Sequence, residues 1–316
     1  MPEGHTLHRL ADGLRERFAG RAVRVSSPQG RFADAAALLD GTRLLDAQAW
    51  GKQLFVEFEG GRFVQVHLGL IGSFDLFDGA PPPPRGQVRL RISTGSITGD
   101  ESITGDESIT GKQSPHEPAS YGDLRGATIC SLLTADQRRA VVDRLGPDPL
   151  RDDADWTAAW VRITRSRKPI GALLMDQAVL AGVGNVYRAE LLFRHRMHPH
   201  RPGNTLRRGQ FEAMWDDLVA LMREGVRTGR IDTVRHDHTP EAMGRDPRVD
   251  DHGGEVYVYR RHGQPCLVCG AKVRTEVLEG RNLFWCPRCQ PRFRSRAGAS
   301  RRPVGRAAPI ARDGGA

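Results

Sequence analysis

The chain has 316 residues, enough for two or three domains with hydrophobic cores of their own. Its net charge of +9 and isoelectric point of about 9.9 favour a polyanionic partner, most simply nucleic acid, although charge alone does not exclude an unspecialised basic protein. No apolar run is long enough to span a membrane, and the N-terminal segment MPEGHTLHRL lacks an apolar signal sequence. We therefore expect a cytoplasmic protein with no membrane partner.

An amphipathic helix is the first predicted element, starting close to residue 2. Its apolar face consists of Leu7, Leu10, Leu14 and Phe18, with arginines between them. From residue 22 to about 133 the pattern changes to apolar and polar residues in alternation, as in QLFVEFEGGRFVQVHL and QVRLRIS, interrupted by glycine pairs. This pattern predicts an antiparallel β-sandwich or barrel, so we assign residues 1–133 to an N-terminal β domain.

A repeat interrupts the predicted β domain. The hexapeptide SITGDE at 96–101 recurs at 102–107, and SITG follows at 108–111. Two and a half copies are too few to stack into a β-helix with a core. We predict that residues 96–113 are an insertion in a loop that connects two strands.

Several helices are predicted over residues 134–262. The segments AVVDRL, DADWTAAWVRIT, PIGALLMDQAVL, VYRAELLFRH and LRRGQFEAMWDDLVALMREGVRTG are separated by short glycine and proline turns. Between two of these helices, the turn AGVGN brings Gly182, Gly184 and Asn185 to the start of the next helix. Backbone N–H groups at such a position can bind phosphate, although an ordinary corner between two helices would look the same. Residues 230–262 form a variable region.

Four cysteines indicate a metal site over residues 263–290. Two CxxC pairs are separated by 16 residues, within the range of a tetrahedral zinc site on a short hairpin; they are Cys266, Cys269, Cys286 and Cys289. The alternatives are two disulfides or four free thiols. Four thiolates leave no open coordination position, so we expect one structural Zn²⁺. Residues 291–316 are predicted to be a disordered basic tail, since 292–316 contain seven arginines and one aspartate.

The N-terminus carries a possible nucleophile. Once Met1 is removed, Pro2 presents a secondary amine, which can attack an electrophilic carbon and form a cationic iminium. Glu3 beside it could donate or accept the proton. Proline followed by glutamate is also a common helix start, so these two residues alone are a weak signal.

A resemblance joins these observations. The segments MPEG, WGKQLF, VHLGL, LGPDPL, DQAVLAGVGNVYRAELLF and RNLFWCPRCQ each match a block of the formamidopyrimidine-DNA glycosylase and endonuclease VIII family of bifunctional DNA glycosylases, in the family's order. The chain resembles this family over roughly residues 1–290, apart from the repeat. The resemblance implies an α+β protein with an N-terminal antiparallel β-sandwich, a helix-two-turn-helix domain and a zinc finger, with damaged DNA bound between them by a monomer.

The resemblance also implies roles in the reaction. Pro2 would attack the sugar C1′ of a nucleotide flipped out of the duplex, and Glu3 would protonate the sugar as the base leaves. Lys52 would position phosphate and assist β-elimination, while Arg281 on the zinc finger would bind phosphate and assist δ-elimination. Asn185 matches a phosphate-binding residue of the family.

Two further residues match positions that contact the gap left by the flipped nucleotide. Leu70 would fill this gap, and Arg125 matches a contact on the strand gap. Gly4 and Leu70 resemble the endonuclease VIII branch, and residues 232–254 lack a long glycine-rich lid, which together imply that the substrates are oxidised pyrimidines and abasic sites. The chain departs from the family at 95–121, where other members carry intercalating residues on a short loop.

One rival function comes from a different class. A noncatalytic zinc-finger protein that senses damaged DNA, or a regulator, would keep Asn185, Arg281 and the cysteines. It would not need Pro2, Glu3 or Lys52, so their presence favours the enzyme.

Overall fold

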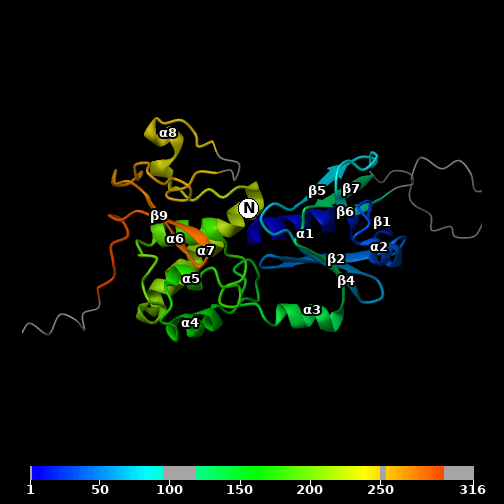
Figure 1. Ribbon diagram of the computed structural model, residues 1–316, viewed down its shortest axis with the longest axis horizontal. Helices are drawn as coiled ribbons and strands as arrows, with labels where there is room; N and C mark the ends of the chain where they lie inside the picture. The colour runs from blue at the N-terminus through cyan, green and yellow to red at the C-terminus, as the bar shows by residue number, and fades with distance from the viewer. Residues whose placement is uncertain (1, 95–118, 250–253, 295–316) are drawn as a thin grey trace, which may run out of the picture.

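The structure, a computed structural model, describes residues 2–94, 119–249 and 254–294. The predicted insertion at 96–113 and nearly all of the predicted tail lie outside these residues. Figure 1 shows a β-rich half and a helical half, with the N-terminus between them. Because the N-terminus lies at this junction, Pro2 and Glu3 lie where side chains from both halves can meet.

Two four-stranded antiparallel sheets form the β-rich half. The first has the strand order β1 (Arg24–Ser26), β6 (Val88–Ser93), β7 (Ser120–Arg125) and β5 (Ser73–Asp78). The second has the order β2 (Leu44–Trp50), β3 (Gln53–Phe58), β4 (Arg62–His67) and β8 (Ile129–Thr134). Inward-facing side chains of both sheets share one core with helix α1 (Gly4–Phe18), whose predicted apolar face is buried. The α+β fold with an antiparallel sandwich is confirmed.

One helix lies where the sequence analysis predicted only strands. Helix α2 (Ala33–Leu39) follows β1, and its Ala36 and Leu39 are buried against the sandwich core. The segment ADAAALL explains the error, because alanine and leucine are strong helix formers and strand formers are absent from it. The prediction of an all-strand segment is therefore wrong at this point.

Helices make up most of the other half of the molecule, although the first helix after the sandwich, α3 (Ala135–Val142), contacts β4 and β8 of the β-rich half (Figure 1). The helical half contains α4 (Trp156–Thr164), α5 (Ile170–Leu173), α6 (Asn185–Arg194), the 3-10 turn η1 (Gly203–Thr205), α7 (Arg208–Thr228), the 3-10 turn η2 (His236–His238) and α8 (Pro240–Met243). Helix α5 is shorter than the predicted PIGALLMDQAVL helix. The side chain of Asp176 accepts the N–H of Ala178 at 3.0 Å, and this local bond competes with continuation of the helix.

A two-stranded hairpin completes the fold and packs on the helices. Strands β9 (Arg274–Leu278) and β10 (Arg281–Trp285) are joined at Glu279 and Gly280, both at positive φ, as a type I′ turn requires. Cys266, Val273 and Phe284 belong to the same buried cluster as the helices. The hairpin is therefore fixed to the helical half by a shared core.

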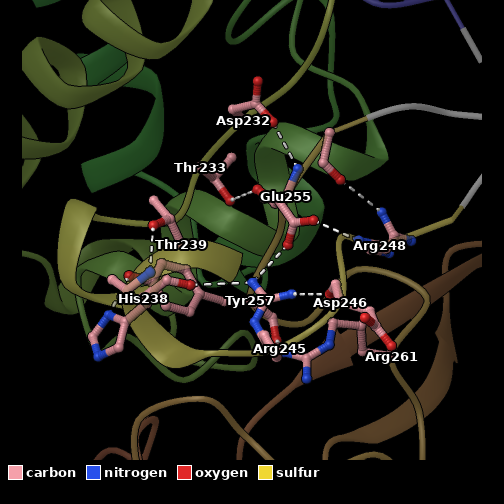
Figure 2. A network of polar contacts seen from close by, with 12 residues as sticks. Asp232, Thr233, His238, Thr239, Arg245, Asp246, Arg248, Glu255, Tyr257 and Arg261 are labelled. Carbon is pink, nitrogen blue, oxygen red and sulfur yellow. Dashed lines mark hydrogen bonds and ion pairs between the residues drawn. The ribbon is translucent and has the colours of Figure 1, made fainter.

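The variable region between α7 and the hairpin is held by polar contacts (Figure 2). The Glu255 carboxylate accepts from the Arg245 guanidinium at 2.6 Å and from the backbone N–H of Arg248 at 2.6 Å. The backbone N–H of Glu255 donates to Asp232 at 2.7 Å, and the Tyr257 hydroxyl forms a hydrogen bond with the ring of His238.

Among the described residues, none of the helices combines the length and the apolar character needed to cross a membrane.

Candidate active site

Glu3 lies at the centre of the junction between the two halves. Its side chain is fully buried, and its carboxylate accepts the backbone N–H groups of Gly184 at 2.8 Å, Val186 at 2.7 Å and Tyr187 at 3.4 Å. These donors form the N-terminus of α6, where the helix dipole stabilises an anion. Burial raises the pKa of Glu3, while the charge of Lys52 and the three N–H groups act in the opposite direction.

From the sequence, the turn before α6 is either a phosphate-binding turn or an ordinary corner between two helices. In the structure, the N–H of Gly184 in this turn and those of Val186 and Tyr187 in the first turn of α6 bind the carboxylate of Glu3. The cause is close packing: the N–H of Gly4 donates to the carbonyl of Gly182 at 2.9 Å, so the start of α1 lies directly on the turn. A Cβ atom at Gly184 would lie 2.3 Å from Cδ of Glu3, so only glycine leaves room for this carboxylate.

Lys52 is held by the turn between β2 and β3. Gly51 has a φ of +59° and packs so closely on the backbone N of Gly182 that a Cβ atom would lie 2.7 Å from it. The N–H of Gly51 donates to Asp148 at 2.7 Å, and the carbonyl of Lys52 bonds Nδ1 of His67 at 2.8 Å. These contacts fix the turn on both sides of the Lys52 side chain.

The ammonium group of Lys52 interacts with charged side chains from both halves of the molecule. Burial lowers the pKa of the Lys52 ammonium, and the carboxylate of Glu3 opposes this shift. The guanidinium groups of Arg281 and Arg188 lower the pKa of Lys52 further. Lys52, Glu3, Arg188 and Arg281 therefore lie within electrostatic reach of one another.

Asn185 connects α6 to the hairpin. Its amide Nδ2 donates to the carbonyl of Asn282 at 2.9 Å, and its Oδ1 accepts from the Arg188 guanidinium. Arg188 is almost completely buried and also donates to the carbonyl of Asn282 at 3.1 Å; burial lowers its pKa to about 10. Because Asn282 follows Arg281 in β10, these bonds hold the exposed Arg281 near the N-terminus of α6.

Pro2 borders a cavity of about 900 Å³. Its walls come from α1, the start of β5 and the end of α7, and they include Thr6, Ser73 and Arg227. The cavity has both polar and apolar walls beside Pro2.

Leu70 and Arg125 lie at the same end of the first sheet. Leu70 lies in the loop between β4 and β5 and is 51% exposed, and its neighbour Ile71 is 89% exposed. Arg125 ends β7, where it pairs with Ser73 and binds the carboxylate of Asp123 at 2.7 Å. The structure therefore brings these two predicted residues to the same end of the sandwich.

The four cysteine sulfur atoms converge in the hairpin. All four lie within 4.8 Å of one another, with Cys266 and Cys289 at 3.9 Å and Cys269 and Cys286 at 3.4 Å. Zinc–sulfur bonds of about 2.3 Å in a tetrahedron place sulfur atoms about 3.8 Å apart, so the donor set fits one zinc ion. Four sulfur ligands leave no position for a substrate, so this ion is structural.

Family models match three parts of the chain. They are the formamidopyrimidine-DNA glycosylase N-terminal domain over residues 1–106, the formamidopyrimidine-DNA glycosylase H2TH domain over 145–236, and the zinc finger found in FPG and IleRS over 263–292. Endonuclease 8 1 of Mycobacterium tuberculosis (strain ATCC 25618 / H37Rv) is 53% identical over 297 residues, which cover 92% of this chain and 100% of the relative. The chain belongs to the formamidopyrimidine-DNA glycosylase and endonuclease VIII family.

Other members of the family are more distant. Formamidopyrimidine-DNA glycosylase of Thermus thermophilus is 30% identical over 295 residues, covering 92% of this chain and 97% of the relative. The solved structure of the Lactococcus lactis Fpg with abasic-site DNA is 21% identical, with a TM-score of 0.68, and covers 92% of this chain and 100% of that one. This similarity to a solved structure supports the fold of the chain. The chain is thus a DNA glycosylase of base excision repair that is more similar to this endonuclease 8 than to these formamidopyrimidine-DNA glycosylases.

Three buried polar residues of this glycosylase were not predicted from the sequence. Arg188 and Glu190 lie within the apolar helix α6, where two charged residues beside Asn185 were a signal that could have been used. The Glu190 carboxylate accepts from the backbone N–H groups of three consecutive residues, 257–259, and from the Thr233 hydroxyl at 2.6 Å. Asp148 lies in LGPDPL, a matched segment whose only acidic residue is now seen to bind the Lys52 turn.

Proposed function

We propose that this glycosylase is bifunctional: it removes oxidised bases from DNA and cleaves the strand at the resulting abasic site by β,δ-elimination. The observation that carries the proposal is the convergence of Glu3 and Lys52 beside the start of the chain. A buried carboxyl group of raised pKa, an ammonium of lowered pKa and the secondary amine that Pro2 presents once Met1 is removed are the groups that Schiff-base chemistry requires.

The first step uses the amine of Pro2. Its lone pair attacks C1′ of the damaged nucleotide, the glycosidic bond breaks, and the base leaves with the proton that the Pro2 nitrogen loses after the new bond forms. Glu3 donates a proton to the sugar oxygen as the ring opens, and the product is an iminium ion between Pro2 and C1′. The raised pKa of Glu3 supports this role, because a carboxyl group must be protonated to act as an acid. The damaged base would occupy the cavity that Pro2 borders.

The second step breaks the sugar–phosphate bonds. Lys52 would bind the phosphate of the damaged nucleotide and assist loss of the 3′ phosphate, and Arg281 would assist loss of the 5′ phosphate. Asn185 donates one amide hydrogen to Asn282, and its second amide hydrogen could bind the same phosphate. A cluster of Lys52, Arg188 and Arg281 around one carboxylate supports phosphate binding, since its net charge is positive.

DNA engagement would extend to the edge of the sandwich. Leu70 would enter the space left by the flipped nucleotide, and Arg125 would contact the DNA at the same end of the sheet. The solved relatives that support the fold include the Lactococcus lactis Fpg in complexes with DNA. Similarity to endonuclease 8, together with Gly4 and Leu70, supports oxidised pyrimidines as substrates. We expect the protein to act on them as a monomer.

Borohydride trapping on an oligonucleotide with an abasic site tests the proposal. Borohydride reduces the iminium to a stable amine, so the wild-type protein should become covalently linked to the DNA, and Pro2→Gly should lose most of this product. If the wild-type protein binds the duplex but gives neither trapped complex nor cleaved strand, the noncatalytic damage sensor is the better assignment.

A further inference from the structure

The Asp148 carboxylate binds three donors from three parts of the chain. Its side chain is fully buried. Oδ2 accepts the Gly51 N–H at 2.7 Å and Nε2 of His8 at 2.7 Å, and Oδ1 accepts the N–H of Leu150 at 3.0 Å. The contact with Leu150 is local, whereas the other two reach the Lys52 turn and helix α1.

One oxygen atom therefore connects two elements of the active site. Gly51 directly precedes Lys52, and the N–H that Asp148 accepts belongs to the positive-φ residue of this turn. His8 lies on the helix that follows Pro2 and Glu3, one turn after His5. The carboxylate accepts, so Nε2 of His8 carries the hydrogen and donates it.

The His8 side chain is the part of this arrangement open to solvent. It is 16% exposed and lines a cavity of about 630 Å³ between α1, β2 and the 150–153 segment. Gly51 cannot be substituted without a collision with Gly182, and Asp148 has no solvent around it. His8 is consequently the member whose contact can be removed with the least disturbance of the core.

We propose that His8 is a positioning residue, which orients the Asp148 carboxylate so that the Gly51 N–H, and with it Lys52, is held in register with Pro2 and Glu3. The inference rests on the proposed function, because it assigns Lys52 to the reaction. Without the His8 donor, the carboxylate can rotate toward its remaining donors, Gly51 and Leu150, and the turn loses this hydrogen-bonded connection to α1. Small displacements of this kind lower a rate more than they lower binding.

The test compares substitutions that differ in reach. His8→Gln keeps an N–H donor at nearly the same distance from the backbone, His8→Asn carries the same amide one methylene shorter, and His8→Leu has no donor. Asp153→Asn is the control, since Asp153 lines the same cavity, and its exposed carboxylate accepts from the Arg151 guanidinium rather than from Gly51 or His8. The readouts are single-turnover cleavage of an abasic-site duplex at saturating protein and the Kd for a duplex with an uncleavable tetrahydrofuran site.

We expect His8→Leu and His8→Asn to slow cleavage by about tenfold or more, with His8→Gln within about threefold of wild type. The Kd should change less than twofold in all of them, and Asp153→Asn should behave as wild type. Equal rates for wild type and His8→Leu would overturn the inference, as would an equal loss in His8→Gln and His8→Asn. Should His8→Leu fail to fold, the Gln and Asn pair still decides.

The outcomes separate this inference from the proposed function. A wild-type protein that shows no borohydride trapping contradicts the Pro2 chemistry itself. A wild-type protein that traps normally, with His8 variants of wild-type rate, contradicts only the positioning role of His8.

Discussion

Gly184→Ala tests whether the N-terminus of α6 holds Glu3 for the reaction. Gly184 has a φ of −116°, which alanine adopts without strain, so the substitution acts through the space its Cβ atom occupies. That atom would lie 2.3 Å from Cδ and 2.5 Å from Oε1 of Glu3, whereas ordinary contacts begin at 3.4 Å. The Glu3 carboxyl group must therefore retreat by roughly 1 Å, since the distance has to rise to that of a normal contact.

The size of the effect follows from this displacement. A retreat of about 1 Å lengthens the bonds from Gly184 and Val186, and misplacement of this order costs about 100-fold in rate, or about 2.7 kcal/mol of activation free energy. Gly209→Ala is a matched control: Gly209 lies in α7, and a Cβ atom there meets nothing within 4 Å. That control should retain full activity and gain about 0.5–1 kcal/mol in stability, because alanine is the better helix former.

Single-turnover base excision on a duplex with an oxidised pyrimidine gives the rate, and urea denaturation gives the free energy of unfolding. Gly184→Ala should be slow while it stays folded with its zinc bound. If it excises the base at the wild-type rate, the contact between Glu3 and α6 has no part in positioning the acid.

Three other predictions concern different parts of the site. Glu3→Gln should slow base excision more than cleavage of a preformed abasic site, because only the first breaks a glycosidic bond; equal losses in gel assays of the two substrates would argue against the acid role. Removal of zinc by a chelator should abolish duplex binding measured by fluorescence anisotropy while leaving the β-sheet circular dichroism, since Arg281 lies on the hairpin; binding that survives would contradict this. Glu190→Gln should lower the free energy of unfolding by about 2–3 kcal/mol in urea titrations, because an amide nitrogen would face backbone N–H donors, whereas the exposed Glu212→Gln should stay within about 0.5 kcal/mol.

The fold could be predicted from sequence wherever a pattern repeats. The alternation in QLFVEFEGGRFVQVHL predicts β3 and β4, and the 3.6-residue spacing of Leu7 to Phe18 predicts α1. Helix α2 was missed because its seven residues lie in a long β region and give no contrast at the scale of a domain. The end of α5 was missed because it depends on a side-chain bond of Asp176 rather than on a glycine or proline.

The residues of the candidate site could be predicted more readily than the contacts that they make. The residue types of Pro2 and Glu3 suggest chemistry, whereas Lys52 was predicted through the resemblance to the family. What Glu3 binds could not be predicted, since its donors are backbone N–H groups more than 180 positions away. Arg188 was missed for a related reason: its function depends on burial, and an arginine in a helix is usually a surface residue.

Burial also explains why the charges of this site need one another. The N–H groups of α6 and the charge of Lys52 stabilise the ionised form of Glu3. The charges of Arg188 and Arg281 destabilise the charged form of Lys52. Three cations around one carboxylate repel each other in a partly buried space, and an arriving phosphate would relieve that repulsion. The same phosphate would favour the charged form of Lys52 and raise its pKa, so the proton that Lys52 holds depends on whether DNA is bound. An active site assembled from two domains thus gains its net positive charge only when α6, the Lys52 turn and the zinc hairpin are all in place.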